Sequence, residues 1–178
     1  MADYFVASLR ELAKDSDVKV HLFRWPLNKE APFEFDFPLN VTAYEKEVEN
    51  DGKVLEIVQD ITPDLIFCSG WVDKTYLRVC KAYFGNVPTV LLMDNNWEFS
   101  IRKIIGLSIG RIKLHRIFSH AWVPGISQVS YAKKLGFSEK KIKTGFYCAD
   151  TRLFEKYADL SVKSKECSFP RSEEHTSE

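Results

Sequence analysis

The sequence predicts an α/β protein with a Rossmann-like parallel sheet and helices on both faces. Residues 64–68 and 88–93 are short, continuous apolar runs, as expected for strands that are buried on both faces. Segments with helical spacing of apolar residues alternate with such strands along the whole chain. This alternation specifies parallel strands joined by right-handed helical crossovers. A chain of 178 residues, 45% of them hydrophobic, has enough apolar material for one core.

The first elements are a helix, a strand, a loop, a second strand and a second helix. Residues 3–14 have a helical apolar face, and Asp3 is placed to cap the first turn. Alternating apolar and polar residues at 18–22 predict a strand that ends before Pro26. We expect a loop at residues 26–38, a strand at 39–44 and a helix at 54–61 that ends at Pro63.

The later elements continue the alternation. A helical pattern at residues 76–84 is closed by Gly85, and a long helical segment runs from about 98 to 118. A strand at 121–123, a helix at 127–135 and a strand near Ile142 follow. Since a doubly wound domain ordinarily opens with a strand and a glycine-rich turn, we expect the first strand to be missing.

The predicted domain organisation is one incomplete Rossmann-like domain at residues 1–160. Residues 161–178 have no apolar periodicity, and we expect them to be a linker remnant with a tail foreign to the domain. Residues 171–178 resemble translated sequencing-adapter sequence.

Composition excludes several function classes. Lys plus Arg and Asp plus Glu number 25 each, so the basic excess typical of nucleic-acid binding is missing. The four cysteines form no C-x-x-C pair and have no histidine at metal-ligand spacing, so no metal site is expected. The sequence shows no signal-peptide pattern and no apolar run of about 20 residues, and we therefore expect a cytoplasmic location.

Four loops follow predicted strands at their carboxyl ends, where open parallel sheets bind ligands. They span residues 69–74, 94–98, 124–128 and 145–150. Two of them combine a tryptophan, whose ring can pack on the C–H face of a sugar, with side chains that hydrogen-bond to hydroxyls. The predicted acceptor-binding residues are Trp71, Asp73, Asp94, Asn95, Asn96 and Trp97. The alternative is that the tryptophans anchor the core and the Asp and Asn residues cap helices or form turns.

Two further features suggest anionic partners. Gly125 and Ser127 lie at a predicted helix start, where backbone N–H groups bind phosphate, although an ordinary helix start has the same pattern. Residues 99–138 contain seven basic and no acidic residues, which favours contact with an anionic membrane surface, with burial of the helix as the alternative. His115 and His120 are interpreted as structural because neither follows the carboxyl end of a strand.

Several segments together resemble the N-terminal, acceptor-side domain of family-four (group 1) GT-B glycosyltransferases. The resemblance covers residues 2–157 and is carried by residues 70–71, 76–77, 87–90, 93–97, 123–125, 131–137, 141–142, 150–151 and Phe154. Where the family commonly reads Asn-Gly-Val-Asp, this chain has Tyr-Cys-Ala-Asp at residues 147–150, so only Asp150 carries over as an interdomain residue.

The resemblance implies transfer of a sugar from a nucleotide-sugar donor to a saccharide or lipid-linked acceptor that this half binds. In the family, the donor and a paired-glutamate motif belong to a second domain, so no cofactor is expected here and the chain by itself is expected to be inactive. Two alternatives stay open: half of a nucleotide-sugar epimerase of the same fold, and a stand-alone receiver-like module with Asp94 as phosphoryl acceptor.

Overall fold

The computed structural model describes residues 3–26, 36–46, 51–95 and 113–146. The chain divides into two units, Met1–Cys148 and Ala149–Glu178, and every described residue belongs to the first. The helices are α1 (Asp3–Leu12), α2 (Asp51–Ile61), α3 (Lys74–Tyr83), α5 (Ile126–Lys134) and the 3₁₀ turn η1 (Glu139–Lys141). The strands are β1 (Val20–Arg24), β2 (Val41–Glu45), β3 (Ile66–Ser69), β4 (Thr89–Leu92), β5 (His120–Val123) and β6 (Ile142–Thr144).

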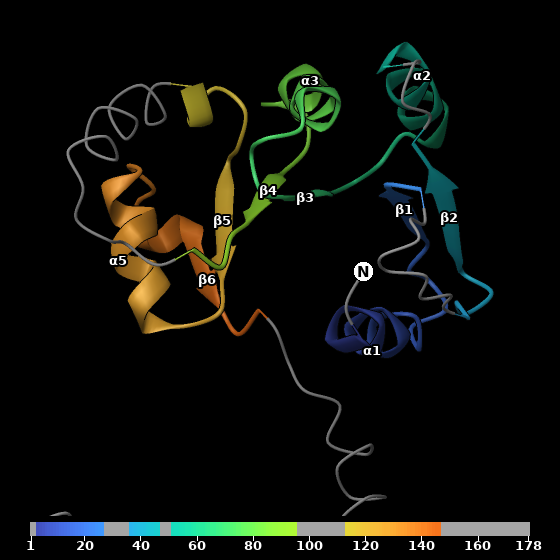
Figure 1. The fold of residues 1–178 in the computed structure, drawn as a ribbon, viewed down its shortest axis with the longest axis horizontal. Helices are drawn as coiled ribbons and strands as arrows, with labels where there is room; N and C mark the ends of the chain where they lie inside the picture. The colour runs from blue at the N-terminus through green and yellow to red at the C-terminus, as the bar shows by residue number, and fades with distance from the viewer. Residues whose placement is uncertain (1–2, 27–35, 47–50, 96–112, 147–178) are drawn as a thin grey trace, which may run out of the picture. The chain divides into compact units, whose positions relative to one another are not determined.

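The strands form two parallel sheets (Figure 1). β1 pairs with β2, and β3, β4, β5 and β6 pair in chain order, each parallel to its neighbour. The predicted Rossmann-like α/β class is confirmed. Among the described residues the helices pack on one face of the four-stranded sheet, so helices on its second face stay a prediction. β1 and β3 are not paired with each other in the described sheets. The predicted absence of the first strand and the predicted domain boundary at residue 160 are not tested by this topology and stay predictions.

Helix α3 shows how local sequence sets an element's ends. The carboxylate of Asp73 accepts hydrogen bonds from the backbone N–H groups of Thr75, at 2.9 Å, and Tyr76, at 3.4 Å, which satisfies two donors of the first turn. The helix ends just before Gly85, whose φ of +90° lies in the left-handed region that glycine adopts without steric cost. Both ends follow from residues adjacent to the helix in sequence.

The main core lies between one face of the four-stranded sheet and its helices. Leu91, Ala121 and Val123 point into it from β4 and β5 and are fully buried. The partners across the layer come from α3, from α5 and from the turn before β5, and include Cys80, Leu114, Phe118, Ala132 and Leu135. Residues 96–112, the first part of the predicted long helix, lie outside the described residues.

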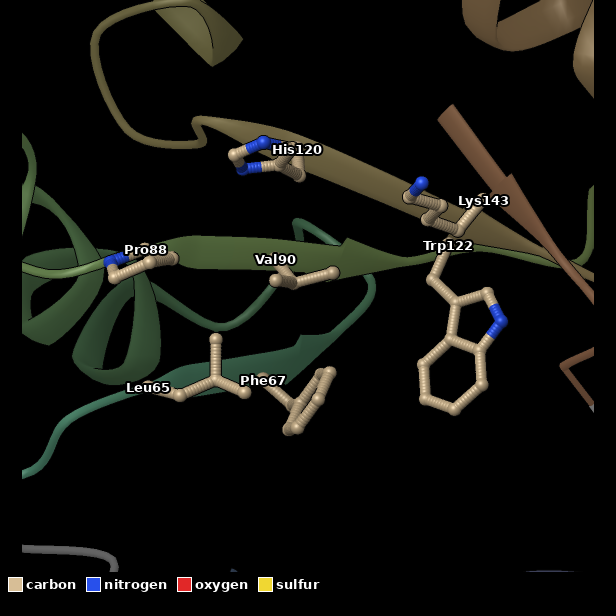
Figure 2. A pocket seen from close by; sticks show the side chains of 7 residues that line it. All are labelled: Leu65, Phe67, Pro88, Val90, His120, Trp122 and Lys143. Carbon is tan, nitrogen blue, oxygen red and sulfur yellow. The ribbon is translucent and has the colours of Figure 1, made fainter. Parts of the chain in front are cut away.

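The opposite face of the four-stranded sheet is apolar and open. Its residues line a shallow pocket of about 370 Å³ (Figure 2): Leu65, Phe67, Pro88, Val90, His120, Trp122 and Lys143. Leu65 and Phe67 are 44% and 45% exposed, and no described helix contributes a residue to the pocket. Because strand order follows chain order, right-handed crossovers place the connecting helices on the other face, which explains the asymmetry.

This asymmetry predicts opposite outcomes for two Leu→Ala substitutions. Leu91→Ala, on the covered face, creates a cavity and is expected to lower the free energy of unfolding by about 2–5 kcal/mol. Leu65→Ala, on the open face, is expected to lower the free energy of unfolding by less than about 1 kcal/mol. Urea unfolding followed by circular dichroism measures both, and equal costs would show that the second face is covered in solution.

Candidate functional site

Parallel pairing brings the loops after β3, β4 and β5 to the same edge of the sheet. In register, Ser69 is opposite Leu92 and Leu92 is opposite Trp122. Gln128 of α5 donates to the carbonyl of Asp94 at 3.5 Å, which joins the loop after β4 to the start of α5. Trp71, Asp94 and Gly125 therefore follow neighbouring strands along one carboxyl edge.

The predicted acceptor-binding residues differ in exposure. Asp94 and Asn95 are exposed, whereas Trp71 is partly buried, packs against the main core and lies edge-on to Tyr131 at 6.3 Å between ring centroids. These contacts match the core-anchor interpretation of Trp71. Asn96, Trp97 and Asp150 lie outside the described residues, so their predicted roles stay predictions.

Asp73, also predicted to bind the acceptor, already has partners within the protein. Besides capping α3, its carboxylate forms an ion pair with Lys46, whose Nζ is 3.0 Å from both carboxylate oxygens. The side chains are only 7% and 14% exposed. The helix-cap interpretation of Asp73 is confirmed, and its carboxylate is fixed in orientation by a cation and by backbone N–H groups.

Two aromatic rings lie close to the Lys46 ammonium group. Its Nζ lies 4.4 Å from the ring centroid of Trp25 and 5.5 Å from that of Tyr76. Both distances are in the range of cation–π attraction. Lys46, Asp73, Trp25 and Tyr76 form what we call the lysine cluster, which gathers residues from the ends of β1, β2 and β3 and from α3.

Burial changes the acidity of one member of this cluster. The hydroxyl of Tyr76 is buried and has no hydrogen-bond partner among the described residues. Desolvation, followed by the nearby Asp73 carboxylate and Cys68 thiol, raises the pKa of Tyr76 from 10 to about 12. Tyr76 is therefore a neutral phenol throughout the physiological range.

The predicted anion site at the start of α5 has an open amino end. Gly125 occupies the N-cap position with extended backbone, and it provides no side-chain cap. Ser127 is exposed, and the first turn of α5 contains no acidic residue. The N–H groups of this turn have the polarity that favours an anion.

In the described part of the basic stretch the charged side chains are exposed, whereas apolar residues between them, such as Leu114 and Phe118, are buried. Lys113, Arg116, Lys133 and Lys134 are exposed, and Lys133 pairs with Glu139 at 3.1 Å, while Arg102, Lys103 and Arg111 lie outside the described residues. Spanning a bilayer takes about 20 apolar residues. The described part of the chain contains no helix that meets this requirement.

The histidines have structural partners, as the sequence predicts. His120 begins β5, at the amino end of the strand, and its Nδ1 is 2.9 Å from Oγ of Ser119. That hydroxyl also accepts from the N–H of Thr89 and donates to its carbonyl, both at 3.0 Å. The His115 ring packs on Phe137 at 5.5 Å.

Sequence reasoning missed Lys46 and Trp25, although each directly follows a strand. The alternating pattern ended the predicted strands at Leu22 and Tyr44, before either residue, and so no ligand loop was expected there.

Comparison with protein families, curated proteins and solved structures finds no match to this chain.

Removing only one partner of the Lys46–Asp73 ion pair is expected to lower the free energy of unfolding. Lys46→Met leaves the Asp73 carboxylate buried without its cation, so the free energy of unfolding should fall by about 3–5 kcal/mol. Adding Asp73→Asn removes the uncompensated charge and keeps a capping side chain, so the double variant should recover part of the loss. Urea unfolding of both variants measures these free energies. If the stability losses of the two substitutions simply add, the result would contradict a paired Lys46 and Asp73.

The raised pKa of Tyr76 predicts a stability change at high pH. The folded protein keeps the phenol proton between pH 10 and about 12, where an unfolded chain has released it. The contribution of Tyr76 to stability is therefore complete below pH 10 and is lost as the pH rises through about 12. Absorbance at 295 nm reports ionised tyrosine, so the difference between wild type and Tyr76→Phe isolates Tyr76. This difference should show that Tyr76 is still protonated at about pH 11, and ionisation near pH 10 would refute the raised pKa.

Proposed function

We propose that this domain is the acceptor-binding half of a GT-B-type glycosyltransferase, which moves a sugar from a nucleotide-sugar donor to a saccharide or lipid-linked acceptor. The observation that supports this most directly is the carboxyl edge of the four-stranded sheet, where Asp94, Asn95 and the start of α5 lie on neighbouring elements. Open parallel sheets bind their ligands at this edge.

The groups at this edge suit a hydroxyl-rich ligand. The exposed carboxylate of Asp94 can accept hydrogen bonds from sugar hydroxyls, and the amide of Asn95 can both accept from them and donate to them. The N–H groups after Gly125, with the hydroxyl of Ser127, suit the phosphate of a lipid-linked acceptor. The exposed cations Lys113, Arg116 and Lys134 suit the anionic membrane surface that presents such an acceptor.

In this proposal the domain contributes binding and orientation. Holding an acceptor in a fixed position relative to a donor converts a bimolecular encounter into an effectively unimolecular step. In the same proposal, a second domain binds the nucleotide of the donor and stabilises the negative charge that develops on it. The property to test on this chain is therefore acceptor binding.

Asp94→Asn is expected to weaken acceptor binding. Replacing a charge-assisted hydrogen bond by a neutral one costs on the order of 1–1.5 kcal/mol, or roughly five- to tenfold in affinity. Chemical-shift titration of the ¹⁵N-labelled chain with a panel of oligosaccharides and a short-chain prenyl-phosphate sugar measures this affinity.

Asp64→Asn is the matched control. Asp64 is also exposed, and it lies at the amino end of β3, away from the proposed site. Its substitution should leave every affinity within about twofold. Absence of saturable binding by the whole panel, or equal losses in both variants, would refute the proposed function.

A further inference from the structure

We propose that Trp25 is the ring on which a pyranose of the acceptor stacks, and that the Lys46–Asp73 pair holds this ring in place. The inference rests on the proposed function and assigns its aromatic contact to a residue that the sequence did not indicate. Three observations carry it: the position of Trp25, its exposure and its fixation from one side.

Trp25 is at the ligand-binding edge of its sheet. It is the first residue after β1, and Lys46 is the first residue after β2. The N–H of Lys46 donates to the carbonyl of Arg24 at 2.8 Å, so β-type pairing extends one residue past β2 and fixes the backbone from which Trp25 projects. Asp73, which pairs with Lys46, lies in the loop after β3, so the carboxyl ends of three strands meet here.

The ring has one occupied face and one open face. The Lys46 ammonium group lies 4.4 Å from the ring centroid, and the side chain of Lys46 is only 7% exposed. Trp25 nevertheless stays 55% exposed. Since the cation covers one face of the indole, the exposed surface includes the other face and the edge of the ring.

The ion pair also makes the open face suitable for a neutral ligand. A lone cation beneath an indole would draw electron density away from the face that attracts the C–H groups of a sugar. Asp73 contacts the ammonium with both oxygens at 3.0 Å and neutralises its charge. The contact with the paired cation restricts the orientation of the ring before a ligand arrives, which lowers the entropy cost of binding.

The other two described tryptophans are less available. Trp71 packs against the main core, and Trp122 donates its indole N–H to the carbonyl of Thr144 at 3.1 Å and lines the sheet face. Both are partly buried, whereas Trp25 is exposed. Among the described tryptophans, Trp25 is therefore the one that offers a ring to a ligand at a strand end.

Indole ¹H–¹⁵N resonances of the 178-residue chain test the assignment directly. The sequence contains four tryptophans, and Trp25→Tyr identifies the Trp25 signal. Titration with methyl β-D-galactopyranoside and methyl β-D-glucopyranoside should shift this signal saturably. Trp25→Ala should weaken binding at least about fivefold, whereas Trp25→Tyr, which keeps a ring, should retain affinity within about threefold.

Controls separate this inference from the proposed function. Trp122→Phe, on the open face of the four-stranded sheet, should change the affinity less than about twofold. Unchanged thermal melting of Trp25→Ala would show that an exposed residue was removed without unfolding. Glycoside binding that depends on Asp94 but not on Trp25 would overturn the stacking role and leave the proposed function intact. A response of the Trp25 signal to uridine alone would assign the ring to a nucleobase, and no response to any glycoside would refute both proposals.

Discussion

The Lys46–Asp73 ion pair connects the two sheets at their carboxyl edges. Asp73 serves two partners: its carboxylate caps α3 and also binds the ammonium group that follows β2. A buried ion pair contributes less net stability than its Coulomb energy suggests, because both charges lose their hydration. Its effect is instead to fix geometry, since a misplaced cation or carboxylate would be left buried without a partner. Trp25, Tyr76 and the first turn of α3 all contact a member of this pair.

A second link joins the sheets through apolar packing. Val54 and Val58 of α2 pack against Val79 of α3, with Phe23 of β1 partly buried against the same cluster. The Tyr83 hydroxyl donates to the carbonyl of Val58 at 3.1 Å and satisfies a polar group at that interface. Apolar burial provides the attraction between α2 and α3, whereas the ion pair specifies which side chains meet at the carboxyl edge.

The fold could be read from sequence because its signals are local. The runs that form β3 and β4, the cap at Asp73 and the left-handed glycine at Gly85 all lie within a few residues of the structure they determine. The candidate site was only partly predictable. The positions of the strand ends indicated Asp94 and Asn95. The same pattern predicted that Trp71 and Asp73 bind a ligand, with core packing and helix capping as the alternatives. In the structure Trp71 packs against the core and Asp73 caps α3, in agreement with those alternatives.

The sequence by itself determined the α/β class, the order of the elements and the loops that follow the carboxyl ends of β3, β4 and β5, because periodicity and capping act over a few residues. Only the tertiary structure showed that Lys46, 27 residues before Asp73, supplies its counter-ion, and that Trp25 rests on that cation. It also decided which face of the four-stranded sheet is covered. These outcomes depend on contacts between segments far apart in the chain, and no local pattern of residue types encodes which distant partner a side chain will meet.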